Sequence, residues 1–128
     1  MPHPISEFID SFGIENHLLR TYCDPKKLTD YIDRHNNIYP EVCDGLRNAG
    51  VLSLHIWVGD SHKGEIFMHI IFDGSNGETL DDAIGPDSDY RKTGGKILEW
   101  EDDMTTNYHA GWTTMPMIHD SANWNKKL

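Results

Sequence analysis

The chain has little positive charge. Its 128 residues include 11 Lys and Arg against 21 Asp and Glu, which gives a formal net charge of −10. Nucleic-acid phosphates and anionic membrane surfaces are bound mainly through Lys and Arg, so this deficit argues against both as partners. The chain also lacks an apolar run long enough to span a bilayer. We therefore expect no nucleic-acid partner and no membrane partner, whereas a neutral or cationic small molecule remains possible.

Cysteine is scarce as well. The two cysteines, Cys23 and Cys43, have a spacing that matches no metal-binding motif. The first residues, Met1-Pro2-His3-Pro4, lack the basic and apolar regions of a signal peptide. We therefore expect a cytoplasmic protein, in which the cysteines are reduced core thiols rather than a disulfide.

The length of the chain suits one domain with a single core. Residues 1–14 are predicted to form a short N-terminal arm, and residues 15–128 to form the domain. Phe8, Ile9 and Phe12 would pack this arm on the body of the domain or on a neighbouring subunit.

Apolar periodicity and turn residues divide the domain into strands and helices. Strands are predicted over residues 17–23, 51–58, 65–73 and 112–120, and helices over 25–35, 40–49 and 96–104, with a weak helical piece at 80–84. This order predicts an α+β fold, a four-stranded antiparallel sheet with its helices on one face. The other face must be covered or solvated, and in a chain this small a face-to-face homodimer is the economical way to cover it.

The most informative stretch runs from Tyr31 to Glu41, where one predicted helix ends and the next begins. Residues four apart lie on the same face of a helix, so Tyr31 and His35 can point into one pocket. An imidazole titrates near neutral pH, and beside a phenol it is suited to acid–base chemistry on a polar ligand.

This stretch resembles the L-rhamnose mutarotase family, whose pattern is Tyr, three residues, then His-Asn-Pro-Ile-Trp-Pro-Glu. Asn37 stands where the family has Pro, and Tyr39 where it has Trp. The resemblance covers about residues 16–120. The residues that agree in the motif are Tyr31, Arg34, His35, Asn36, Ile38, Pro40 and Glu41.

The resemblance implies a ferredoxin-like subunit that pairs into a dimeric α/β barrel. It also implies an isomerase, without cofactor or metal, that interconverts the α and β anomers of a deoxy sugar such as L-rhamnose or L-fucose. The residue aligned with the family's proton donor is His35. Glu101 stands where the family has the second of two sugar-contacting tryptophans, and Leu54 where it has a sugar-contacting tyrosine. The candidate substrate-binding residues are Tyr31, Trp100, Glu101, Leu54 and Trp57.

Mutarotation opens a hemiacetal ring and closes it on the other face, so protons must move at the ring oxygen and at the anomeric hydroxyl. One imidazole can serve in both directions. Trp100 would stack on the C–H face of the sugar, and Tyr31 would hold a hydroxyl. Glu101 is a hypothetical second proton carrier.

Two other functions stay open. One is a non-catalytic sugar-binding or regulatory module on the same fold, because two of the family's sugar contacts are replaced. The other is a metal-dependent small enzyme, because His55, His69 and His119 all fall in predicted strands. Three histidines on one sheet face would form a site for zinc or iron with an open position, if the second, third and fourth strands are neighbours.

Overall fold

A four-stranded antiparallel sheet forms one layer of the protein. The computed structural model describes residues 13–121, so Phe8, Ile9 and Phe12 of the predicted arm lie outside the described residues. The strands lie in the order β2-β3-β1-β4, and every pair is antiparallel. Their bounds are β1 Ile14–Tyr22, β2 Val51–Val58, β3 Glu65–Asp73 and β4 Thr113–Met115.

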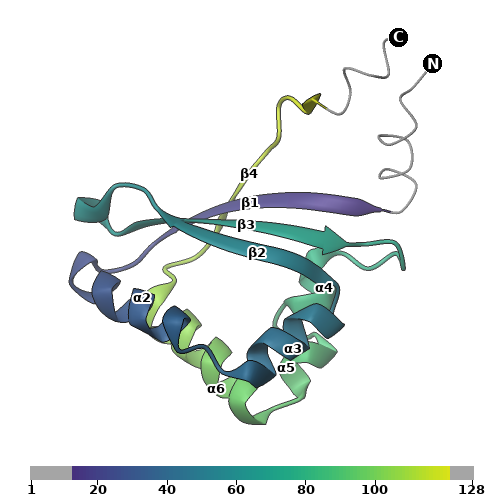
Figure 1. Ribbon diagram of the computed structural model, residues 1–128, viewed down its shortest axis with the longest axis horizontal. Helices are drawn as coiled ribbons and strands as arrows, with labels where there is room; N and C mark the ends of the chain where they lie inside the picture. The colour runs from purple at the N-terminus through teal and green to yellow at the C-terminus, as the bar shows by residue number, and fades with distance from the viewer. Residues whose placement is uncertain (1–12, 122–128) are drawn as a thin grey trace.

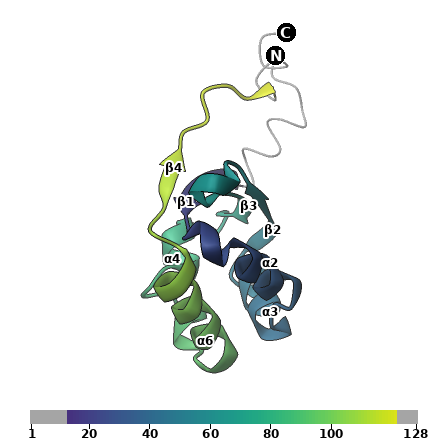
Figure 2. The ribbon, with the colours of Figure 1, turned by 90° about the vertical axis from the view of Figure 1, so that its left-hand side faces the viewer.

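The helices form the second layer. Figure 1 shows α2, α3, α4, α5 and α6 on the same face of the sheet, which confirms the predicted α+β, ferredoxin-like fold. Seen from the side, α2 and α3 lie under one half of the sheet and α6 under the other half (Figure 2). The helical elements are η1 Pro25–Lys27, α2 Leu28–Asn36, α3 Pro40–Asn48, η2 Ser61–Lys63, α4 Leu80–Ile84, α5 Asp89–Lys92, α6 Gly95–Asp103 and η3 Met104–Tyr108.

Several predicted boundaries change. The first strand begins at Ile14, inside the predicted arm, because its whole length from Ile14 to Tyr22 pairs with β3. The last strand is only three residues long and ends before Pro116, which has no N–H to donate to a strand ladder. The polar stretch contains a second short helix, α5, beside the predicted piece at Leu80–Ile84.

Local signals fix the helix that carries the Tyr31–His35 pair. The Asp24 side chain accepts a hydrogen bond from the Lys26 backbone N–H at 2.9 Å, and Pro25 opens the 3-10 turn that leads into α2. The next helix starts directly at Pro40. The capped 3-10 turn thus leads into α2, and Tyr31 on that helix faces the core, where its side chain is only 2% exposed.

The core lies between the helices and the inner face of the sheet. On β3 the inner positions are Ile66, Met68, Ile70 and Phe72, three of which are buried. Two clusters fill the layer, one around Tyr31, Trp100 and Tyr108 and the other around Val51, Ile70 and Phe72. Within residues 13–121 no helix has the length and apolarity needed to cross a membrane.

Candidate functional site

A cavity of about 780 Å³ opens between the inner face of the sheet and the helices. The sheet supplies a largely apolar wall, because the inward positions of β1, β2 and β3 alternate with outward ones. The helices and the segment that follows η3 supply the polar and aromatic groups. Among the lining residues are His17, Leu19, Leu54, Ile56, Met68, His35, Arg91, Trp100, Glu101, His109 and Trp112.

His35 lies on this cavity, one helical turn after Tyr31. Its Nδ1–H donates to the Tyr31 backbone carbonyl at 2.9 Å, which leaves Nε2 as the free nitrogen of the ring. The His35 ring lies 4.4 Å from the Tyr31 ring and 5.0 Å from the Trp100 ring, edge-on to the latter. Burial lowers the pKa of His35, although the bond to the Tyr31 carbonyl opposes this. His35 is therefore a neutral base at neutral pH.

Tyr31 itself does not line the cavity, although it contacts His35, which does. Its hydroxyl is 3.0 Å from His109 Nε2. Burial raises the pKa of the Tyr31 phenol, so the hydroxyl stays protonated at neutral pH. The structure thus brings Tyr31 and His35 together as the helix spacing predicts, but the Tyr31 hydroxyl meets a second histidine.

His109 is the cavity residue that the sequence pattern does not indicate. It follows η3, and its backbone N–H donates to the Met104 carbonyl at 2.8 Å. Its ring lies 4.5 Å from that of Trp112, another cavity residue. Burial, with a smaller contribution from His35, lowers the pKa of His109 to about 4. The segment has neither helix nor strand periodicity, so no local signal points to this histidine.

Glu101 shares the cavity with Trp100 but has its own partners. The Tyr90 hydroxyl donates to Glu101 Oε1 at 2.8 Å, and Arg91 pairs with Oε2 at 3.3 Å. Burial raises the pKa of Glu101, while these two partners oppose the shift. Trp100 is 7% exposed and Leu54 lies on the opposite wall of the cavity. The predicted positions His35, Leu54, Trp100 and Glu101 therefore all line one cavity.

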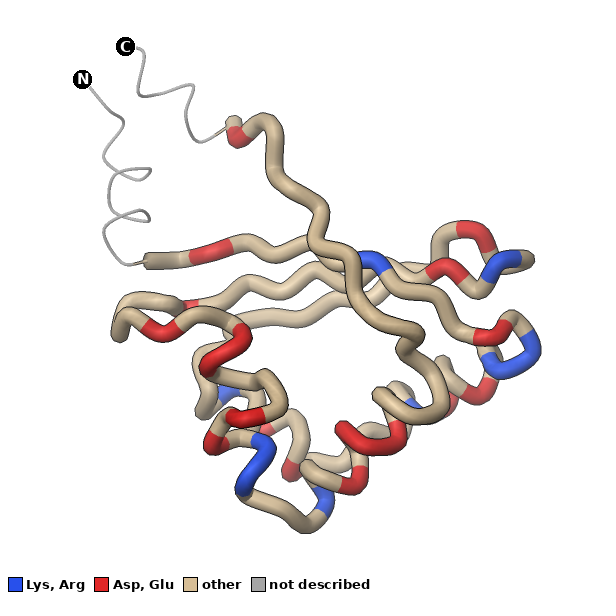
Figure 3. The backbone as a smooth tube through the Cα atoms, turned by 180° about the vertical axis from the view of Figure 1, so that it is seen from behind, with Lys and Arg blue, Asp and Glu red and all other residues tan. Residues whose placement is uncertain are grey.

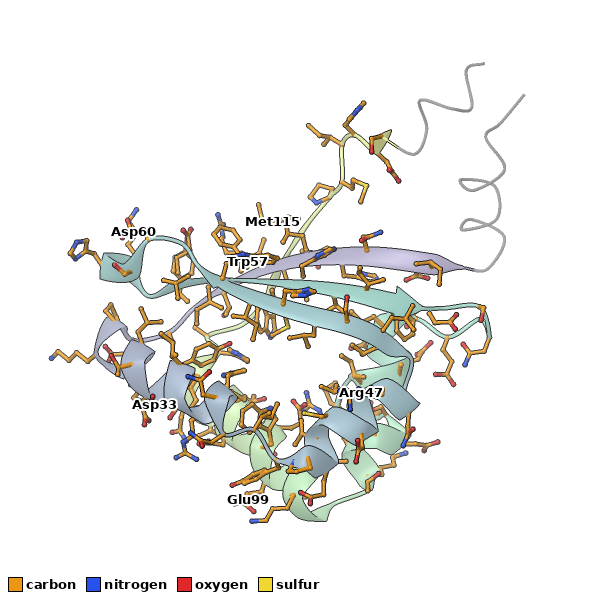
Figure 4. The ribbon with its side chains drawn as sticks, in the orientation of Figure 1. Asp33, Arg47, Trp57, Asp60, Glu99 and Met115 are labelled. Carbon is orange, nitrogen blue, oxygen red and sulfur yellow. The ribbon has the colours of Figure 1, made fainter. Side chains whose placement is uncertain are left out.

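Trp57 does not join them. It is 53% exposed and lies on the side of the sheet away from the helices, as Figure 4 shows. There it lines a shallow groove with Leu18, His69 and Met117. Leu54 and Trp57 are three residues apart on β2, so the alternation of the strand places them on opposite faces.

The strand histidines do not converge as the metal hypothesis requires. His55 and His69 are register partners on β2 and β3, and His69 Nε2 is 3.0 Å from Asn16 Oδ1. The predicted placement of the last strand is wrong, because β4 pairs with β1 and ends four residues before His119. Within residues 13–121 no group of three His, Cys, Asp or Glu side chains is placed to hold a metal ion.

Comparisons with known proteins identify the family and support the fold. The sequence profile of the L-rhamnose mutarotase family matches residues 17–126. The fold is similar to that of an L-rhamnose mutarotase from Formosa agariphila, with 15% identity, a TM-score of 0.54, and coverage of 83% of this chain and 95% of that one. It is also similar to a Nitrosomonas europaea protein assigned to the antibiotic biosynthesis monooxygenases, with 10% identity, a TM-score of 0.52 and coverage of 80% and 86%. No curated protein matches the chain in sequence.

Proposed function

Because the chain belongs to the L-rhamnose mutarotase family, a family of isomerases that interconvert sugar anomers, we propose that its cavity binds one monosaccharide and that His35 moves the protons. The observation that carries this proposal is the tautomer of His35 and the neutrality of its ring. Its Nδ1–H is held by the Tyr31 carbonyl, and burial keeps the ring neutral, so Nε2 is an unprotonated base beside Trp100.

One base can carry the proton in both directions of the reaction. His35 Nε2 takes the proton of the anomeric hydroxyl while the bond between C1 and the ring oxygen breaks. The imidazolium then gives the same proton to the ring oxygen, which yields the open-chain aldehyde. After rotation about the C1–C2 bond the steps run in reverse and close the ring on the other face. Such a proton carrier accelerates a reaction by about a hundredfold to ten-thousandfold.

The substrate that we propose is a deoxy sugar such as L-rhamnose or L-fucose. Trp100 and Leu54 offer apolar surface to its C–H groups, while Glu101 and Arg91 offer polar atoms to its hydroxyls. The volume of the cavity, about 780 Å³, is ample for one monosaccharide with water.

Saturation-transfer NMR of anomeric exchange tests the proposal. We expect the protein to accelerate exchange for one sugar of a panel that includes L-rhamnose, L-fucose and other deoxy and uronic sugars. His35→Gln should lose at least about a hundredfold of that acceleration. His62→Gln, at an exposed histidine in η2, is the matched control and should keep full activity.

Two results would count against a mutarotase. Full activity of His35→Gln would remove the assigned base. Binding of a sugar without accelerated exchange in the wild type would instead favour the non-catalytic sugar-binding module.

We further propose that two copies pack through the outer face of the sheet. This face carries exposed apolar side chains that a soluble monomer would leave in water, including Leu18 at 37%, Trp57 at 53% and Met117 at 57% exposure. Figure 3 shows the charges concentrated on the helices and loops, with few along the strands. A self-complementary apolar face poor in charge fits a twofold homodimer.

Analytical ultracentrifugation tests the dimer. We expect the wild type to sediment as a dimer at micromolar concentration and Trp57→Glu as a monomer, because the new charge would be buried at the contact. Leu98→Glu is the control, since Leu98 is an exposed apolar residue on α6 rather than on the sheet. A wild-type monomer, or a dimer unaffected by Trp57→Glu, would contradict the assignment.

A further inference from the structure

Both histidines that contact Tyr31 have one ring nitrogen bonded to it, through different atoms of the tyrosine. His35 Nδ1 bonds the Tyr31 backbone carbonyl at 2.9 Å, and His109 Nε2 bonds the Tyr31 hydroxyl at 3.0 Å. A carbonyl only accepts a hydrogen bond, whereas a protonated phenol can donate one. Tyr31 therefore accepts a hydrogen bond from His35 and can donate one to His109.

The bond to the carbonyl fixes the proton of His35 on Nδ1, so its Nε2 is an acceptor. The Tyr31 hydroxyl has no other hydrogen-bond acceptor among residues 13–121, and its side chain is 2% exposed. Its O–H therefore donates to His109 Nε2, because a buried hydroxyl without an acceptor is costly. The proton of a neutral His109 must then reside on Nδ1.

His35 Nε2 and His109 Nδ1 are the two ring nitrogens that do not bond Tyr31. Among residues 13–121, two side-chain nitrogen or oxygen atoms are both buried and without a hydrogen-bond partner, Arg20 Nε and Ser53 Oγ. His35 Nε2 and His109 Nδ1 are not among them, so neither is a fully buried atom without a partner. Both residues line the same cavity. The site thus presents one imidazole as an acceptor and the other as a donor while both rings are neutral.

We propose that Tyr31 presets both tautomers, so that His109 Nδ1–H donates to the ring oxygen of the sugar while His35 Nε2 takes the anomeric proton. This inference rests on the proposed mutarotase function and names His109 as a second catalytic residue. His109 contributes a hydrogen bond and keeps its own proton throughout. The proton that His35 removes from the anomeric hydroxyl is the one that reaches the ring oxygen, so the step balances.

The donor matters because negative charge develops on the ring oxygen when its bond to C1 breaks. A neutral N–H held in place by a buried hydroxyl needs no reorganisation to stabilise that charge. Glu101 is less suited to this position, because both of its carboxylate oxygens are already bonded, to Tyr90 and Arg91, and a carboxylate cannot donate.

Imidazole nitrogen NMR of the free protein tests the tautomers without any sugar. We expect His35 and His109 both to carry their proton on Nδ1 at pH 7.5. In Tyr31→Phe, His109 should shift toward the Nε2–H tautomer, whereas His35 should not, because its bond is to the backbone. Tyr108→Phe is the matched control, since this buried phenol contacts the Tyr31 ring but donates to Asp30. An Nε2–H tautomer of His109 in the wild type would overturn the proposal.

Two substitutions then test the donor. His109→Asn places an amide N–H where Nδ1 lies, and His109→Gln places one where Nε2 lies. We expect His109→Gln to lose about tenfold to a hundredfold in kcat, as for a lost hydrogen bond to a charged atom, and His109→Asn to retain more of it. Equal loss in both variants, or the reverse order, would overturn the donor role. Absence of turnover in the wild type would overturn the proposed function and with it the donor role of His109 toward the sugar, whereas the preset tautomers are tested separately by NMR of the free protein.

Discussion

Histidine and tryptophan side chains lie on both sides of the sheet, in different surroundings. The inner face meets Trp100, His35 and His109 across a cavity, whereas the outer face carries Trp57 and His69. Trp100 packs edge-on against the His35 ring, and His35 and His109 each have one nitrogen bonded to Tyr31. On the outer face His69 bonds Asn16 of the neighbouring strand.

The comparison shows that residue type alone does not identify a site. Histidine and tryptophan occur on both sides of the sheet, but His35 and His109 combine partial burial, a fixed partner and a second nitrogen beside the cavity. Burial lowers the pKa of His35 and of His109, and the tyrosine between them fixes their hydrogen bonds. These conditions make a neutral base and a neutral donor. The outer face instead exposes apolar side chains such as Trp57 and Leu18.

The largest expected difference between the two sides of the sheet is in the free energy of unfolding when a tryptophan is removed. Trp100→Ala should lower the free energy of unfolding by about 3–5 kcal/mol, because it removes a large buried side chain. Trp57→Ala should cost the subunit itself less than about 1 kcal/mol, because the side chain is half exposed. Urea denaturation at several protein concentrations measures both. Trp57→Ala should change only the concentration-dependent part, as expected for a dimer contact.

A smaller difference in stability is expected between two ion pairs of α6, Arg91–Glu101 beside the cavity and Lys96–Glu99 on the surface. Glu101→Gln should cost about 1–3 kcal/mol, because it removes a charge-assisted bond from Tyr90 and the partner of Arg91 beside the cavity. The exposed pair Lys96–Glu99 is the control, and Glu99→Gln should cost at most about 1 kcal/mol. Thermal unfolding of both variants checks this order. Similar costs for the two variants would mean that the cavity pair is as well solvated as the surface pair.

The parts of the site that the sequence predicts are those fixed by local signals. Asp24 and Pro25 start the helical segment, and the four-residue spacing then places Tyr31 and His35 on one face of α2. Strand alternation likewise separates Leu54 from Trp57 on β2. Alternation does not say which face meets the helices, because that depends on packing between elements distant in the chain. Leu54 and Trp57 are both candidate substrate contacts from the sequence, and only Leu54 lines the cavity.

The parts that escape prediction depend on long-range contacts. His109 reaches Tyr31 across 78 positions of the sequence, through a π-helical turn and an irregular segment without periodicity. The last strand is short because its ladder stops before Pro116, and it pairs with β1 rather than with β2 or β3. Hydrophobic patterning predicts which segments form strands, but the order of strands in a sheet is a property of the whole fold.

The smallest effect is the acid sensitivity of stability, which distinguishes the partly buried His109 from an exposed histidine. The folded-state pKa of His109 is about 4, below the value of about 6.5 for an unperturbed histidine, so the unfolded chain binds more protons as the pH falls. The stability that the neutral ring contributes is complete above pH 6.5 and is lost progressively as the pH falls toward 4. Between pH 7 and 5.5 the loss should be about 1 kcal/mol.

Urea denaturation of the wild type and of His109→Asn at pH 7 and at pH 5.5 measures this loss. The variant should lose about 1 kcal/mol less than the wild type over that interval, since His35 and the carboxylates are present in both. His62→Asn, at an exposed position, should follow the wild type. If His109→Asn also followed the wild type, the ring would be protonated as readily in the folded chain as in the unfolded one. His109 would then be a cation at mildly acidic pH, and its Nε2 would no longer accept the Tyr31 hydroxyl.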